Sequence, residues 1–197
     1  MNPRIIQGIS SLLKIFNLEI IKTNPKEAVK FARNYFHGKD VVAAEIGVFF
    51  GENARQINKN LNIKKLYLID PYMKYEEYKN DGAYTKLKEA KKKAHIINNF
   101  KNNIWIEEFS EDAIRKIKEE LDFIYIDGNH EYEYVKKDLE LYWPKIKRGG
   151  IISGHDIQYK EVSRAVLEFA SKNKLQVNFG ERRDWWIIKN ENNKSPA

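Results

Sequence analysis

The chain has 197 residues, which suits one domain with a sizeable core. Hydrophobic residues make up 42% of it, which excludes a chain that is disordered as a whole. It contains no cysteine, so disulfides, thiolate nucleophiles and cysteine-based zinc sites are excluded. The net charge of +7 permits an acidic partner, but the lysines are scattered over many expected helix faces, which favours an ordinary solvated surface.

Two helices are expected before the first strand. Ile5–Phe16 has helical spacing of apolar residues, and no cleavage-type sequence follows it, so we do not interpret it as a signal peptide. Asn24 as N-cap and Pro25 at the first position predict a second helix that ends near His37. Residues 1–37 are therefore expected to form a helical cap. No stretch reaches the roughly 18 apolar residues of a membrane span, so we expect a cytoplasmic protein.

Strands and helices are then expected to alternate. The expected strands are Val41–Ile46, Lys65–Ile69, Ile104–Glu107, Phe123–Ile126 and Gly150–Ser153, and the helices that follow them are Glu52–Leu61, Tyr84–Phe100, Glu111–Leu121, Tyr132–Ile146 and Lys160–Asn173. Such alternation predicts an α/β fold with a parallel sheet covered on both faces. Strands Gln176–Phe179 and Trp185–Lys189 have no helix between them, so one must run antiparallel. The domain is expected to span 38–190, followed by a polar tail at 191–197.

The first strand leads into a glycine-bearing turn that suits a ligand. It ends in Glu45-Ile46-Gly47 and turns through Gly51 into a helix, where a ligand can approach bare backbone and free N–H groups. Glu45 has an equal alternative as a cap of a loop amide. Asp70 follows the second strand, 23 residues after Gly47, where a carboxylate can accept hydrogen bonds from ribose hydroxyls. Its alternative role is a turn residue before Pro71.

Polar residues also follow the later strands. Ser110 is a natural N-cap, and a ligand base could lie against Phe109 and the Ser110 backbone. Asp127 directly follows the fourth strand, and His155-Asp156 follows the fifth. If these strands are neighbours, the three side chains converge, and carboxylates with an imidazole suit a divalent cation. Cap or loop roles remain the alternatives for His155 and Asp156, and a helix-start role is the alternative for His130.

These residues resemble a known family. The order Glu45-x-Gly47, Asp70, Ser110, Asp127 and a Gly-Gly strand resembles class I S-adenosylmethionine-dependent methyltransferases. The segment 122–156 is similar to small-molecule O-methyltransferases, including macrocin- and rhamnosyl-type sugar methyltransferases and cephalosporin-hydroxylase relatives, and distantly to catechol O-methyltransferase. The resemblance covers about 41–189. It implies a Rossmann-like, doubly wound, mostly parallel seven-stranded sheet with a C-terminal antiparallel hairpin and an N-terminal helical cap.

The resemblance also implies site residues. Cofactor contacts are expected from Glu45, Gly47, Gly51, Asp70, Phe109, Ser110 and Asp127. Asp127 and Asp156 stand where metal-dependent members hold a divalent ion such as Mg²⁺, and His155 stands where a carboxylate is frequent. His130 falls near a catalytic lysine of catechol-type enzymes, so it is the expected general base beside Asp127. The implied reaction is methyl transfer from S-adenosylmethionine to a hydroxyl of a small molecule, sugar or glycan.

Rival functions are weighed on the same residues. The positive charge suggests a nucleic-acid methyltransferase, but Asp127-Gly128-Asn129-His130 stands where base-amino methyltransferases usually carry Asn/Asp-Pro-Pro-Tyr. A nicotinamide oxidoreductase is disfavoured because Phe49 occupies the place of a required glycine. A non-catalytic cofactor-binding protein stays open, as does a homo-oligomer. The tyrosine-rich segment 72–83 is the expected lid or acceptor contact.

Overall fold

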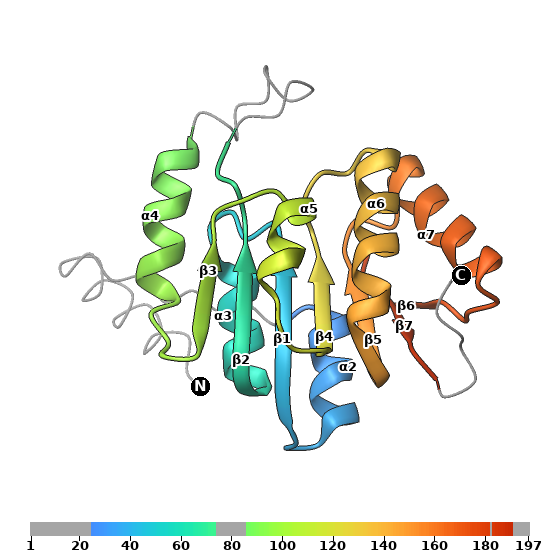
Figure 1. The fold of residues 1–197 in the computed structure, drawn as a ribbon, viewed down its shortest axis with the longest axis horizontal. Coiled ribbons are helices and arrows are strands. Elements are labelled where there is room, and N and C mark those ends of the chain that lie inside the picture. Colours follow the sequence, from blue (N-terminus) through green and yellow to red (C-terminus); the bar gives the residue numbers. More distant parts are fainter. Residues whose placement is uncertain (1–24, 74–85, 182, 191–197) are drawn as a thin grey trace, which may run out of the picture.

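A seven-stranded sheet forms the centre of the protein, with strand order β3-β2-β1-β4-β5-β7-β6 (Figure 1). The computed structural model describes residues 25–73, 86–181 and 183–190. Its strands are β1 (Asp40–Ile46), β2 (Asn62–Ile69), β3 (Asn103–Ile106), β4 (Leu121–Ile126), β5 (Ile146–Gly154), β6 (Asn178–Phe179) and β7 (Trp185–Ile188). Strands β1 to β5 run parallel, and β7 pairs antiparallel with both β5 and β6. The predicted doubly wound sheet with a C-terminal antiparallel hairpin is confirmed.

Helices cover both faces of this sheet. They are α2 (Glu27–Phe36), α3 (Glu52–Asn60), α4 (Leu87–Ile97), α5 (Ser110–Ala113), α6 (Tyr132–Tyr142) and α7 (Lys160–Lys172), with 3₁₀ turns η3 (Ile114–Lys116) and η4 (Trp143–Lys145). One core cluster joins α2, α3 and α4 to the sheet, and the other joins α5, α6 and α7 to it. Successive strand side chains alternate between the two clusters: Val41 and Ala43 face the first, whereas Val42 and Ala44 face the second.

Two predicted helices differ from the structure. Helix α2 begins at Glu27, not at Pro25, and its N-cap is Lys26, which makes no side-chain capping bond. The Ala28 N–H instead donates to a carboxylate that is distant in sequence, Asp184 Oδ2, at 2.8 Å, so tertiary structure sets this helix start. Asn24 lies outside the described residues, as do the predicted helix Ile5–Phe16 and segment 74–83.

The predicted helix Glu111–Leu121 is wrong in its second half. Helix α5 and η3 together end at Lys116, and Leu121 begins β4. The four-residue spacing of Ala113, Ile117 and Leu121 resembles a helical stripe, and all three side chains are indeed buried. Here Ile117 reaches the core from a short turn, and Leu121 reaches it by pairing with Ile146 across β4 and β5. Ile146, predicted as a helix end, is therefore also a strand residue.

The paired tryptophans behave as their strand positions predict. Trp185 is buried in the core, whereas Trp186 faces the opposite side of β7 and stacks on Phe31 of α2 at 4.9 Å between ring centres. Helix α2 is thereby packed against the sheet.

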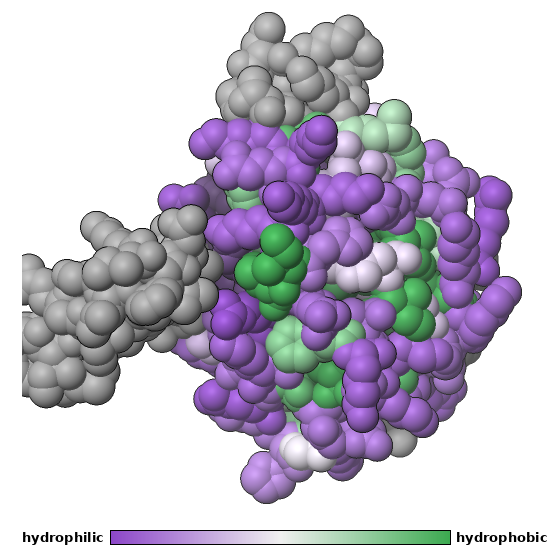
Figure 2. Space-filling view, turned by 90° about the vertical axis from the view of Figure 1, so that its left-hand side faces the viewer, coloured by the Kyte–Doolittle hydropathy of each residue, from purple (hydrophilic) through white to green (hydrophobic). Residues whose placement is uncertain are grey.

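Strand β3 ends the sheet on the other side, and among the described residues no strand pairs with its outer edge. Strand β3 is short, and the face toward α4 and β3 is mostly hydrophilic with small separate apolar areas (Figure 2). Ile96, Phe100 and Ile104 are exposed apolar side chains of this region. Among the described residues, no helix is both long and apolar enough to cross a membrane.

Candidate functional site

A cavity of about 560 Å³ lies where the carboxyl ends of the parallel strands meet. The chain moves outward from β1 through β2 to β3 and then returns to β4 on the other side of β1. The switch between β1 and β4 leaves a crevice where open α/β sheets bind ligands. The predicted site residues that line the cavity are Glu45, Gly47, Asp70, Phe109, Ser110, Asp127 and His130. Gly51, His155 and Asp156 do not line it.

The predicted glycines shape this end of β1. Gly47 has φ +84°, and a Cβ there would stand 2.1 Å from the carbonyl oxygen of Asp127, so no larger residue fits without moving β4. Gly51 has φ +78° at the N-cap of α3, and a Cβ would stand 2.4 Å from Asn98 Nδ2. The same Nδ2 donates to the Gly51 carbonyl oxygen at 2.8 Å. Gly51 thus joins α3 to α4 and does not contact the cavity.

Glu45 is a buried carboxyl group at the cavity. Its side chain is 1% exposed, and Asn53 Nδ2 donates to its Oε1 at 3.0 Å. Its Oε2 is buried and has no hydrogen-bond partner among the described residues. Burial raises the pKa of Glu45 to about 8, although the Asn53 bond and the charge of Lys26 lower it. The alternative role expected for Glu45 was to accept a backbone N–H of a loop. Its Oε1 instead accepts a hydrogen bond from the side chain of Asn53.

Asp70 lines the cavity and also stabilises the turn that follows β2, so its two expected roles are compatible. Its Oδ1 accepts the Tyr72 N–H at 2.7 Å, and its Oδ2 accepts the N–H groups of Val48 and Phe49 at 3.0 and 2.8 Å. Burial raises the pKa of Asp70 although these N–H groups lower it. The carboxylate therefore ties the loop after β1 to the end of β2.

The predicted N-cap role of Ser110 is wrong. Phe109 is the N-cap of α5, and Ser110 is the first helical residue. The Ser110 hydroxyl instead contacts the carboxylate of Asp138 on α6. Asp138 also lines the cavity, and burial raises its pKa to about 7 although the Ser110 contact lowers it. Sequence analysis missed Asp138 because a lone acid within a helix carries no motif.

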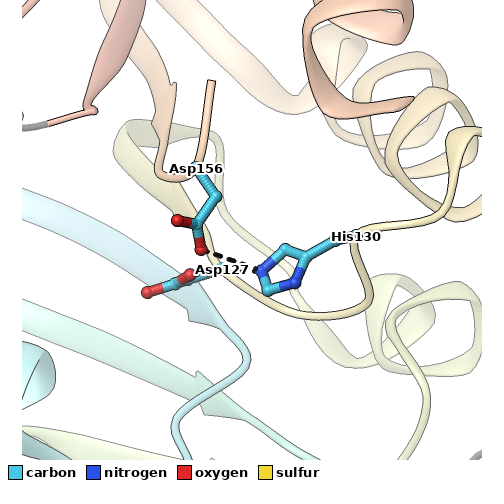
Figure 3. A group of neighbouring side chains, drawn as sticks. All are labelled: Asp127, His130 and Asp156. Atoms are coloured by element: carbon cyan, nitrogen blue, oxygen red, sulfur yellow. Dashed lines mark ion pairs between the residues drawn. The ribbon is translucent and has the colours of Figure 1, made fainter. Parts of the chain in front are cut away.

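Three potential metal donors meet beside the cavity. Asp127, His130 and Asp156 point toward one another, and one ligand atom from each lies within 4.8 Å of the others (Figure 3). His130 Nε2 lies 3.2 Å from Asp156 Oδ2 and 3.8 Å from Asp127 Oδ1. These two carboxylates raise the pKa of His130 to about 9. Two carboxylates and an imidazole at this spacing form a suitable donor set for a divalent cation.

His155, the predicted imidazole ligand, is not one of these three donors, but it lies beside them and faces both carboxylates. Its Nδ1 lies 3.1 Å from Asp156 Oδ2 and 3.9 Å from Asp127 Oδ1, and its Nε2 lies 4.0 Å from Asp184 Oδ1. Burial alone would raise the pKa of Asp156, but hydrogen bonds from His130 and His155 hold it well below its ordinary value. The expected convergence of Asp127, His155 and Asp156 is present because β4 and β5 are neighbours.

Lys26 is a cavity residue that sequence analysis missed. Its Nζ lies 2.6 Å from Asp127 Oδ2, although the two residues are 101 positions apart, and 5.0 Å from the centre of the Tyr125 ring. Burial raises the pKa of Asp127, but the contact with His130 and the charge of Lys26 outweigh burial, so the pKa lies below its ordinary value. No local sequence signal marks this lysine among many others.

Comparison with known proteins assigns the family. A protein-family model described as "Methyltransferase domain" matches residues 44–157, more than half of the chain. An uncharacterized protein of Acanthamoeba polyphaga mimivirus is 30% identical over 154 residues, which cover 75% of this chain and 66% of that protein. The chain thus spans about two thirds of the length of this relative.

Solved structures share the fold at low identity. An rRNA methylase from Streptococcus thermophilus has a TM-score of 0.61 at 13% identity, with 88% of this chain and 100% of that chain covered. The O-methyltransferase NovP has a TM-score of 0.60 at 14% identity, covering 83% and 80%. An O-methyltransferase from Bacillus cereus in complex with SAH has a TM-score of 0.54 at 12% identity, covering 96% and 92%. From the matched family model, the chain belongs to this methyltransferase-domain family, and its sheet has the class I methyltransferase fold that these solved structures share.

Proposed function

We propose that the protein transfers a methyl group from S-adenosylmethionine to a hydroxyl of a small molecule, sugar or glycan, with assistance from a divalent cation such as Mg²⁺. The observation that supports this most directly is the cluster of Asp127, His130 and Asp156, whose donor atoms lie within 4.8 Å of one another. Asp127 and His130 also line the cavity, so this cluster adjoins the expected cofactor site. A hydroxyl acceptor needs its proton removed, and these groups are suited to that task.

The proposed cofactor contacts follow from the lining of the cavity. Glu45 and Gly47 would bind the amino-acid end of the cofactor, and Asp70 would accept hydrogen bonds from the ribose. Phe109 and Ser110 would flank the adenine. When bound, the cofactor's sulfonium supplies the electrophilic methyl group, and the chain supplies orientation and exclusion of water.

The donor set fits a divalent cation. Asp127 and Asp156 would hold it with His155 as the imidazole ligand, which leaves the imidazole of His130 to act as the base. A cation there would lower the pKa of a bound hydroxyl. His130 would then accept the hydroxyl proton on its imidazole, with Asp127 holding the ring in place. The carboxylates that raise the pKa of His130 to about 9 would be neutralised by the cation, which favours the neutral base.

A nucleic-acid acceptor is the second candidate function. The net charge of +7 supports it, and one of the proteins that share the fold is an rRNA methylase from Streptococcus thermophilus. The sequence after β4, Asp127-Gly128-Asn129-His130, lacks the proline-tyrosine motif usual for base-amino transfer, which favours a hydroxyl acceptor. A non-catalytic cofactor-binding role is the third candidate.

Calorimetric titration tests the proposal. The protein is titrated with S-adenosylmethionine and with S-adenosylhomocysteine, each with and without Mg²⁺, and a separate Mg²⁺ titration probes the acidic cluster. Micromolar binding of both nucleosides and a separate Mg²⁺ response support the proposal, and turnover is then screened on hydroxylated sugars, phenols and RNA. No Mg²⁺ response would remove the metal from the mechanism, and turnover on RNA alone would favour the second candidate.

Asp70→Asn tests the role of Asp70 in cofactor binding better than Asp70→Ala does. The alanine would leave the N–H groups of Val48, Phe49 and Tyr72 without their acceptor and would disturb the loop itself. Asparagine removes the charge and retains one acceptor oxygen, which can serve the Val48 and Phe49 N–H groups but not the Tyr72 N–H as well, so it disturbs the loop less than alanine does. We expect it to weaken cofactor binding while its circular dichroism spectrum stays that of the wild type.

A further inference from the structure

Lys26 lies outside the matched residues 44–157, yet its side chain lines the cavity. Its Nζ lies 5.0 Å from the centre of the Tyr125 ring, and Tyr125 pairs with Glu45 across β4 and β1. Tyr125 faces the core cluster that joins α2, α3 and α4 to the sheet, as does Ala43, two residues before Glu45. By strand alternation, Glu45 points to the same side as the ammonium of Lys26.

Glu45 has an unused acceptor on that side. Its Oε2 is buried without a hydrogen-bond partner among the described residues, and the side chain lines the cavity at 1% exposure. Burying a polar oxygen without a partner is costly, and such atoms in native proteins usually have a partner that the structure lacks. A ligand that brings a hydrogen-bond donor to Oε2 would remove this cost.

The cavity therefore presents a fixed cation beside a buried acid. We propose that Lys26 and Glu45 together bind the α-amino-acid end of the cofactor, Lys26 pairing with its carboxylate and Glu45 with its ammonium group. The proposal rests on the proposed function, because it requires the cofactor to occupy this cavity. An α-amino acid carries one charge of each sign, so a lysine and a glutamate on the same side of the cavity match it in sign. Lys26 then shares its three N–H donors between this carboxylate and Asp127.

The position of Lys26 is set by the fold. Asp184 is fully buried, its Oδ2 accepts the Ala28 N–H at 2.8 Å, and its Oδ1 accepts the Tyr125 hydroxyl at 2.7 Å. One carboxylate thus ties the first turn of α2 to β4. Lys26 precedes this turn directly, so the same contacts fix its backbone relative to β4, and Asp127 is the residue that follows β4.

Three ligands that differ by single groups test the proposal on the full chain. S-adenosylhomocysteine carries both charges, S-adenosyl-3-thiopropylamine lacks only the carboxylate, and 5′-methylthioadenosine lacks both. Dissociation constants are measured by calorimetry for the wild type, Lys26→Met, Lys26→Arg and the control Lys30→Met. Lys30 lies one turn further along α2 and does not line the cavity.

We expect the wild type to bind S-adenosylhomocysteine roughly 10- to 100-fold more tightly than the thiopropylamine, as a charge-assisted hydrogen bond contributes. Lys26→Met should lose this preference and keep its affinity for methylthioadenosine, whereas Lys26→Arg and Lys30→Met should retain the preference.

Two results would overturn the assignment of Lys26. One is a preference that persists in Lys26→Met, and the other is an equal loss of all three ligands, which would mark a purely structural lysine. Failure of the wild type to bind any of the three would refute the proposed function itself. If Lys26→Met does not fold, Lys26→Gln provides the uncharged variant with a polar end.

Discussion

Replacing Glu45 with glutamine should stabilise the protein, and more strongly at high pH. The pKa of the buried carboxyl is raised from 4.5 to about 8, so the folded state prefers its protonated form. The stability contributed by this group is complete below the unfolded pKa and is lost as the pH rises through the folded pKa. Glutamine keeps an oxygen that can accept the Asn53 bond and carries no charge to bury.

The magnitude follows from the pKa shift. Each pKa unit corresponds to about 1.4 kcal/mol. Glu45 therefore costs about 5 kcal/mol at pH 9, where it is ionised in the folded state, and about 2 kcal/mol at pH 6, where the folded state must bind a proton that the unfolded chain has lost. Glu45→Gln should therefore gain about 3 kcal/mol of stability relative to the wild type between these two pH values. Groups that do not interact with Glu45 titrate equally in both proteins and cancel in this difference.

Urea denaturation at pH 6 and pH 9, followed by tryptophan fluorescence, measures the effect. Glu52→Gln is the control, because Glu52 is a partly exposed carboxylate of the next helix, paired with Lys93 at 2.7 Å. We expect the control to change stability by less than about 1 kcal/mol at either pH. A difference between wild type and Glu45→Gln that does not grow with pH would refute the reasoning. It would mean that Lys26 already neutralises an ionised Glu45.

Three further predictions address the site and its scaffold. Gly47→Ala should abolish cofactor binding and lower the melting temperature, since its Cβ would meet the Asp127 carbonyl oxygen at 2.1 Å; calorimetry and thermal melting measure both. Asp127→Asn keeps an oxygen that can accept the Lys26 N–H, so cofactor binding should persist while the Mg²⁺ response and metal-dependent turnover are lost, and full activity on a true acceptor would rule out the metal mechanism. Asp184→Ala should destabilise the protein by about 3 kcal/mol, because it removes the acceptor for the Ala28 N–H and the Tyr125 hydroxyl; unchanged urea denaturation would show that α2 is held by other contacts.

Local patterns in the sequence were sufficient for the fold. Short apolar runs separated by helical segments predicted the parallel sheet, because a strand buried on both faces needs a continuous apolar run. The glycines at 47 and 51 and the acids at 45, 70 and 127 marked the strand ends. The carboxyl ends of parallel strands meet at one edge, so Gly47 and the three acids could be placed together without knowing a single contact, whereas Gly51 packs against α4 away from the cavity.

Contacts between distant segments were decided by the tertiary structure. The sequence could not show that Lys26 reaches Asp127 over 101 positions, or that Ser110 turns from a cap toward Asp138, because neither contact has a local pattern. The sequence also could not predict that α5 ends early, because apolar residues four positions apart suit both a helix and a turn followed by a strand. A sequence motif predicts the backbone conformation at the end of one strand. The charges and pKa values of the site depend on the side chains that helices from other parts of the chain bring to it.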